Sequence, residues 1–287
     1  MSEKQLFVRT VALLGAFVLF VSAAAACATA PEPVPGPPPP VVVERPVPPP
    51  EVVTEAEPPG AYHPPHSFIE QITAKYARNS DTVGWLYVPN TSINDVILHY
   101  PHDANEFYLR RNFDRRTSFA GSYFADFRNT FDGTAAGLSR NTVIYGHSLD
   151  LTDNPDAPYF DQLKRFLSED FARQNPYIYF SVAGEDLVWQ IFAVYYATMY
   201  LPYNLPDFTD EGFERILGEM KGRSQFIYDA QVGPEDRILT LSTCTYVFTP
   251  GVFPNRYRFV ISARLVRDDE TRSPTARLER NPSPLAP

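Results

Sequence analysis

Short runs rich in β-branched and aromatic residues dominate the chain between residues 66 and 267. They read GWLYVP, INDVILHY, GSYFAD, NTVIYGHS, YIYFSV, LVWQIFAVYYATM, RILTLSTCTY and YRFVISARLV. This composition is typical of β-strands, and the Asn-Thr-Ser between the first two runs favours a turn. Many short strands with few helices predict a mainly β fold, in which a barrel or closed sheet is decorated with helices.

Four segments between these runs indicate helices. SFIEQITAKYARN has apolar residues at helical spacing and Ser67 as a candidate N-cap, which predicts a leading helix. EFYLRRNF is short and predicts a brief helix, and PYFDQLKRFLSEDFARQ predicts a helix or a helix pair. TDEGFERILGEMKG predicts a helix capped by Thr209 or Asp210.

Residues 1–30 have the pattern of a membrane anchor or signal segment. Lys4 and Arg9 precede an apolar run from about Val11 to Ala30, and no further Lys or Arg follows until Arg45. This asymmetry predicts a cytoplasmic N-terminus with the remainder of the chain outside, and the run is long enough to span a bilayer. We favour a retained single-pass anchor. A cleaved signal peptide and a lipoprotein signal with lipidation at Cys27 remain alternatives.

Two other segments are unsuited to packing a core. Residues 31–65 hold fifteen of the 29 prolines, which predicts an extended stalk; at ~3.1 Å per residue such a stalk would span roughly 100 Å. Residues 268–287 are charged and proline-rich, which predicts a disordered tail. The globular domain is therefore expected at 66–267.

Composition narrows the chemistry that this domain can support. A formal charge of -9 argues against nucleic-acid binding, which needs a basic face. The only cysteines, Cys27 and Cys244, do not form a disulfide framework. No CxxC or HxxxH motif points to a structural metal site. These observations favour a buried core residue or a nucleophile for Cys244 over a metal ligand.

A cysteine nucleophile needs a base or a cation that favours its thiolate. His147 ends the predicted strand NTVIYGHS, after a glycine that could permit a sharp turn, and Cys244 follows RILTLS. Arg256 and Arg258 open the last strand, where alternate residues share one face, so either could reach the thiol. Structural roles for each of these residues remain the simpler alternative on this reasoning alone.

Taken together, TLSTC, VIYGH and an arginine that opens the next strand resemble the sortases, the cysteine transpeptidases of Gram-positive cell surfaces. GWLYVPNTSINDVIL, YLRRNF and AGSYFADFRN resemble the class B branch. The resemblance covers about residues 67–267. It implies an eight-stranded β-barrel with N-terminal helices and a helix in the loop before the cysteine strand.

The resemblance also implies roles for individual residues. Cys244 matches the nucleophile, His147 the general acid and base, and Arg258 the residue that stabilises the oxyanion, with Arg256 as its alternative. Ser242 and Thr243 could line the substrate groove. Two further expectations, which the resemblance does not supply, are that Asn141 could orient the loop carrying His147 and that Tyr145 packs in the core.

The implied partners are secreted proteins with a C-terminal sorting signal, an amine of a peptidoglycan precursor, and the membrane through the N-terminal segment. No metal or cofactor is implied. A hydrolytic cysteine peptidase, a pilus-polymerising sortase and a non-catalytic surface-display domain remain alternatives.

Overall fold

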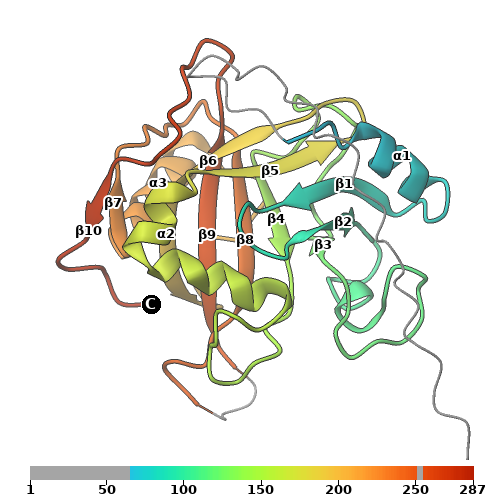
Figure 1. Ribbon diagram of the computed structural model, residues 1–287, viewed down its shortest axis with the longest axis horizontal. Coiled ribbons are helices and arrows are strands. Elements are labelled where there is room, and N and C mark those ends of the chain that lie inside the picture. The colour runs from blue at the N-terminus through green and yellow to red at the C-terminus, as the bar shows by residue number, and fades with distance from the viewer. Residues whose placement is uncertain (1–64, 251–254) are drawn as a thin grey trace, which may run out of the picture. The chain divides into compact units, whose positions relative to one another are not determined.

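Eight of the described strands close into a barrel (Figure 1). They are β1 (Thr82–Tyr87), β2 (Asn94–Leu98), β3 (Phe124–Ala125), β4 (Asn141–Tyr145), β5 (Tyr177–Val182), β6 (Val188–Thr198), β8 (Ile238–Cys244) and β9 (Tyr257–Leu265). Their order around the barrel is β1-β2-β3-β4-β8-β9-β6-β5. The predicted mainly β class and the eight-stranded barrel are thus confirmed.

The computed structural model describes residues 65–250 and 255–287. The predicted anchor or signal segment at 1–30, with Cys27, and all of the predicted stalk except Pro65 lie outside them. Within the described ranges, no helix combines the length and the apolar character that crossing a bilayer requires.

Apolar side chains fill the barrel and also cover its outside. Inside it, residues from neighbouring strands form one buried cluster, among them Phe180, Trp189, Leu239 and Phe259. Outside it, α3 (Asp210–Arg223) buries Phe213, Ile216, Leu217 and Met220 against β6 and β9. Strands buried on both faces read as continuous apolar runs rather than alternating ones, which explains the sequence of β6.

The other helices follow their predictions closely. The leading helix is α1 (Ile69–Tyr76), although Phe68 rather than Ser67 occupies its N-cap position. The described residues contain this one helix before β1.

EFYLRRNF forms the short helix η1 (Tyr108–Arg110). Of the two alternatives for PYFDQLKRFLSEDFARQ, one helix or a pair, the structure shows the pair, η2 (Tyr159–Leu167) and α2 (Glu169–Gln174). Ser168 separates them, and its extended backbone and hydroxyl cap α2. Thr209 caps α3 as predicted, because its hydroxyl accepts from the Gly212 amide.

The prediction of a disordered C-terminal tail is wrong. β10 (Leu278–Arg280) pairs antiparallel with β7 (Phe226–Tyr228), and the two strands lie side by side in Figure 1. Leu278 is buried in the barrel core cluster. Composition could not reveal this, because the order comes from a strand edge about fifty residues earlier in the chain and not from the tail itself.

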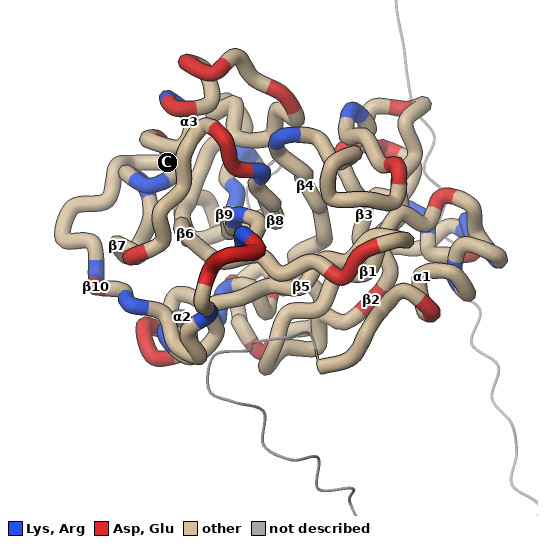
Figure 2. The backbone as a smooth tube through the Cα atoms, turned by 90° about the horizontal axis from the view of Figure 1, so that it is seen from above, with Lys and Arg blue, Asp and Glu red and all other residues tan. Residues whose placement is uncertain are grey.

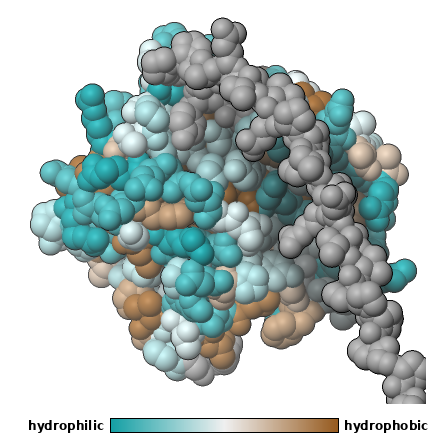
Figure 3. Space-filling view, viewed as in Figure 1, coloured by the Kyte–Doolittle hydropathy of each residue, from teal (hydrophilic) through white to brown (hydrophobic). Residues whose placement is uncertain are grey.

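Charged residues lie mostly on loops and helices, with both signs interspersed (Figure 2). On the face shown in Figure 3, hydrophilic residues cover most of the visible surface and apolar ones form separate small groups.

Candidate active site

Strand register brings the predicted nucleophile and histidine to the same end of the barrel. β4 and β8 run parallel, with Tyr145 opposite Ser242. His147 and Cys244 each lie two residues further along, so both leave their strands at the same level. Cys244 is the last residue of β8, and it is half-buried with a free thiol.

The antiparallel neighbour of β8 supplies the third predicted residue. Arg258, the second residue of β9, is the register partner of Cys244. Its Nη1 donates to the carbonyl oxygens of Asn255 (3.0 Å) and Tyr257 (2.9 Å), which holds the half-buried guanidinium against its own strand.

The alternative arginine is not part of this arrangement. Arg256 is exposed and precedes β9, so the alternation expected of a strand does not extend to it. Its carbonyl oxygen accepts from the Met199 amide (2.9 Å), and its side chain does not line the cavity that Arg258 lines.

A cavity of about 190 Å³ lies where these three residues meet. Its lining consists of Asn105, Glu106, Leu109, Phe124, Tyr145, Gly146, His147, Ser242, Thr243, Cys244 and Arg258. The structure thus brings Cys244, His147 and Arg258 to one cavity, together with Ser242 and Thr243.

The surroundings of His147 disfavour its protonated form. Its Nε2 lies 2.8 Å from the carbonyl oxygen of Leu109, which can only accept, so Nε2 carries the hydrogen. Burial lowers the pKa of His147, the Arg110 charge lowers it further, and the bond to Leu109 opposes both. Nδ1 is therefore the ring nitrogen that remains to take up or release a proton.

Ser242 and Thr243 line the cavity, but their hydroxyls are bonded within the protein. The Ser242 hydroxyl lies 2.9 Å from the hydroxyl of Tyr203, and Thr243 donates to the carbonyl oxygen of Gly146 (2.8 Å). Thr243 therefore ties the residue before the nucleophile to the residue before His147. This contact fixes the two strand ends together.

Of the two remaining expectations, that for Asn141 is wrong, whereas Tyr145 packs, partly buried, against the hydrophobic cluster that includes Phe124. Asn141 begins β4 and donates to the carbonyl oxygens of Tyr203 and Leu205, so it fixes the segment after β6. At about 3.3 Å per strand residue it is roughly 20 Å of chain away from His147. Tyr145 lines the cavity, where its hydroxyl donates to Asp126 (2.9 Å) and accepts from Asn204 (3.1 Å).

Sequence reasoning missed one wall of the cavity. Asn105, Glu106 and Leu109 come from the segment around η1, whose short irregular sequence carries no periodic signal. It also misjudged Gly146, whose φ is not in the left-handed region. A Cβ at Gly146 would lie 2.6 Å from the Phe160 ring, so this position needs glycine because a larger residue would clash with that ring.

The arrangement has the parts that acyl transfer through a cysteine requires. A thiol can attack a carbonyl carbon, a histidine can move the proton of the leaving group, and a permanently charged arginine can stabilise the oxyanion. A half-buried position makes such charge interactions stronger than they would be in open water.

Comparison with known proteins agrees with this chemistry. The sortase domain family matches residues 86–266. Sortase B of Listeria monocytogenes is 36% identical over 169 residues, which cover 58% of this chain and 63% of that protein, less than two thirds of its length. Sortase B of Staphylococcus aureus is 32% identical over 190 residues, covering 66% of this chain and 72% of that protein.

Solved structures give the same result. A Staphylococcus aureus sortase B–substrate complex superposes with a TM-score of 0.59 at 30% identity, covering 70% of this chain and 86% of the other. Clostridium perfringens sortase B gives 0.58 at 29% identity, covering 68% and 99%. This chain therefore belongs to the sortase family, in its class B branch.

Proposed function

We propose that this protein cleaves a sorting signal after threonine and transfers the released protein to an amine of a peptidoglycan precursor. The supporting observation is the single cavity lined by Cys244, His147 and Arg258 at one end of the barrel. That sortase B of Staphylococcus aureus has been solved as a substrate complex supports a substrate-binding role for this chain.

The proposed reaction has two halves. In the first, His147 takes up the proton of the Cys244 thiol, the thiolate attacks the threonine carbonyl, His147 passes that proton to the departing amide nitrogen, and the C–N bond breaks to leave a thioester. In the second, an amine attacks the thioester and gives its proton to His147, the C–S bond breaks, and the released thiolate takes that proton back from His147. Arg258 stabilises the oxyanion in each half.

The proposed location is the outer face of the cell membrane. The charge asymmetry of residues 1–30 orients the chain with its catalytic domain outside, and the stalk at 31–65 would hold that domain away from the bilayer. Membrane association is general among the sortases, and the predicted anchor accounts for it in this chain.

The test is a transfer assay with the purified full-length chain in detergent. A peptide library with one fixed threonine and varied flanks, covering NPxTx-like and LPxTG-like motifs, is offered with and without an amine such as triglycine. We expect cleavage after threonine and amine incorporation. Equal cleavage without amine, and no incorporation, would favour the hydrolytic peptidase instead.

Two cysteine variants form a matched pair for this assay. Cys244→Ala abolishes both cleavage and the thioester adduct seen by mass spectrometry, whereas Cys27→Ala removes the only other thiol and leaves both intact. Activity that survives in Cys244→Ala would rule out the thioester mechanism, and an unsubstituted chain that shows neither cleavage nor adduct would favour the surface-display alternative. Incorporation of a pilin lysine in preference to triglycine would favour a pilus polymerase.

A further inference from the structure

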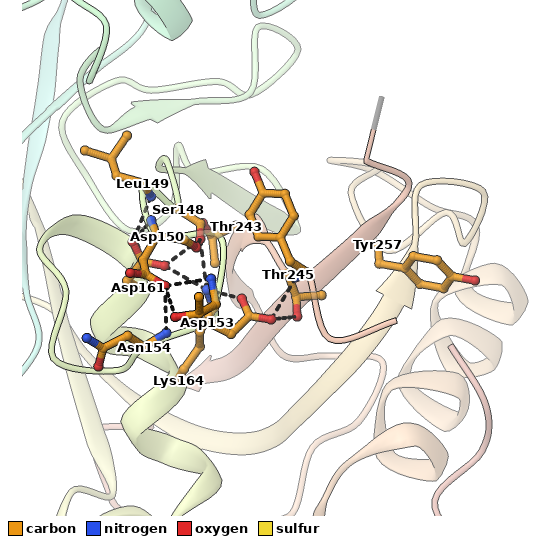
Figure 4. A network of polar contacts seen from close by, with 12 residues as sticks. Ser148, Leu149, Asp150, Asp153, Asn154, Asp161, Lys164, Thr243, Thr245 and Tyr257 are labelled. Carbon is orange, nitrogen blue, oxygen red and sulfur yellow. Dashed lines mark hydrogen bonds and ion pairs between the residues drawn. The ribbon is translucent and has the colours of Figure 1, made fainter. Parts of the chain in front are cut away.

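A buried lysine cluster, consisting of Ser148, Asp153, Asp161 and Lys164, lies beside the candidate active site (Figure 4). Lys164 is 3% exposed and Asp161 is fully buried. Charged side chains are rarely buried so completely unless they are paired. The reaction proposed above uses none of these four residues, so their role needs a separate account.

One half of the cluster holds the loop that follows His147. Asp161 accepts hydrogen bonds from the amides of Leu149 (2.7 Å) and Asp150 (3.1 Å) through Oδ2. Lys164 donates to Asp161 Oδ1 (2.7 Å) and to the Ser148 hydroxyl (2.9 Å). The three residues directly after His147 are thus fixed to η2, which carries Asp161 and Lys164.

The other half holds the segment that follows Cys244. Asp153 Oδ2 accepts from the Thr245 hydroxyl (2.7 Å) and from the Tyr246 amide (2.7 Å), on the first two residues after the nucleophile. The other oxygen of Asp153, Oδ1, forms an ion pair with Lys164. Lys164 therefore joins two carboxylates. Asp161 binds the loop that follows His147, and Asp153 binds the segment that follows Cys244.

The backbone conformation of Asp153 suits its contacts with the segment after Cys244 at a cost in conformational energy. Its φ of 58° lies in the left-handed region, which side chains other than glycine adopt at a cost and in which Asp and Asn are the most tolerated. Burying three charges also costs desolvation free energy, so apolar residues of similar volume would often stabilise the fold at least as well. What apolar residues could not do is bind backbone amides on both loops.

We propose that Asp153 is a positioning residue for the transpeptidation, which through Lys164 and Asp161 fixes the segment after Cys244 relative to the loop after His147. The cluster thereby sets the separation of thiol and imidazole. This proposal rests on the proposed function for its catalytic part only. The mechanical link between the two segments does not depend on activity.

Hydrogen–deuterium exchange on the full-length chain tests the link by itself. In Lys164→Met, we expect amides in both 148–153 and 244–250 to exchange faster, by roughly tenfold or more, while β5 and β6 stay protected. Asp153→Gly, which suits the left-handed backbone, should affect 244–250 most. The control Asp156→Asn removes an exposed carboxylate of the same loop, which pairs only with Arg165 in the described structure, and should change neither segment.

Kinetics test the catalytic part. Asp153→Asn keeps the left-handed backbone and an oxygen acceptor but loses the ion pair. We expect kcat for peptide transfer to fall about tenfold, and about a hundredfold in Asp153→Gly, with KM nearly unchanged, because misplaced reacting groups slow chemistry more than binding. Thr245→Val should lower kcat less and should add little to Asp153→Gly, since both remove the same hydrogen bond.

The outcomes separate the two proposals. If Lys164→Met loosens one segment without the other, or if Asp153→Gly transfers peptide as fast as Asp156→Asn, the positioning role is overturned. If all variants and the unsubstituted chain transfer no peptide, the proposed function fails, and the exchange data still decide whether the cluster links the two segments. Restoration of kcat in Lys164→Arg relative to Lys164→Met supports an ionic link.

Discussion

Gly146→Ala should impair this protein more than its small size suggests. Gly146 directly precedes His147, and a Cβ built there would lie 2.6 Å and 2.7 Å from two ring carbons of Phe160 and 2.8 Å from Tyr123. The two rings stack on each other with centroids 4.7 Å apart and are buried, so neither can swing away. The Phe160 amide also donates to the carbonyl oxygen of His147 (3.2 Å).

The magnitude follows from these distances. Carbon atoms in contact prefer separations of about 3.5–4.0 Å, so the new methyl group needs close to 1 Å of additional space. Overpacking of this kind costs about 1–3 kcal/mol in the free energy of unfolding. If the strand end moves instead of the rings, His147 moves with it, and a shift of about 1 Å can reduce kcat up to roughly a hundredfold.

Urea unfolding, followed by tryptophan fluorescence, measures the stability change. Trp85 and Trp189, the only two tryptophans, both lie in barrel strands, so the signal reports the barrel. Gly218→Ala is the matched control: Gly218 lies in the interior of α3, with nothing within 4 Å of a new Cβ. The same substitution should there stabilise by about 0.5–1 kcal/mol.

Two results would refute this reasoning. One is a Gly146→Ala variant whose unfolding midpoint and kcat both equal those of the unsubstituted chain. The other is a change in the free energy of unfolding with the same sign and size as in Gly218→Ala, because a shared effect would come from the residue type and not from the contacts with Phe160 and Tyr123.

Further predictions concern pH and the C-terminal strand. Burial lowers the pKa of His147 below its ordinary value, so at acid pH the unfolded chain binds a proton that the folded chain does not. The stability due to this group is present above about pH 6.5 and is lost as pH falls toward the folded pKa. His147→Gln should therefore lose less stability between pH 7.5 and 5.5 in urea titrations, and equal losses would contradict the lowered pKa. Leu278→Ala should lower the free energy of unfolding by about 2–3 kcal/mol, because it removes a buried side chain. Glu279→Ala, at the exposed neighbour, should change it by less than about 0.5 kcal/mol in the same experiment. Similar effects of the two substitutions would mean that β10 does not pack as described.

Local sequence patterns predicted most of the helices and strands. The β-branched and aromatic runs predicted the barrel strands, because such residues pack well on a pleated surface. The start of α3 was also predicted, with Thr209 as one of two candidate caps, since a hydroxyl cap acts within three residues of chain. The sequence left one helix or a pair open for η2 and α2, and the structure shows the pair. The tail was misjudged because β10 is ordered by its pairing with β7, which no local composition reports.

The sequence by itself determined the types of chemical group available: a single thiol in the globular domain, a histidine at a strand end and arginines before the last strand. Tertiary structure decided which of them meet. The parallel pairing of β4 with β8 places Cys244 level with His147, and the antiparallel pairing with β9 places Arg258 beside the thiol, while Arg256 falls before the strand begins. The buried lysine cluster was likewise decided by tertiary structure alone. Its carboxylates and its lysine acquire their roles only when loops distant in sequence are packed together, away from water.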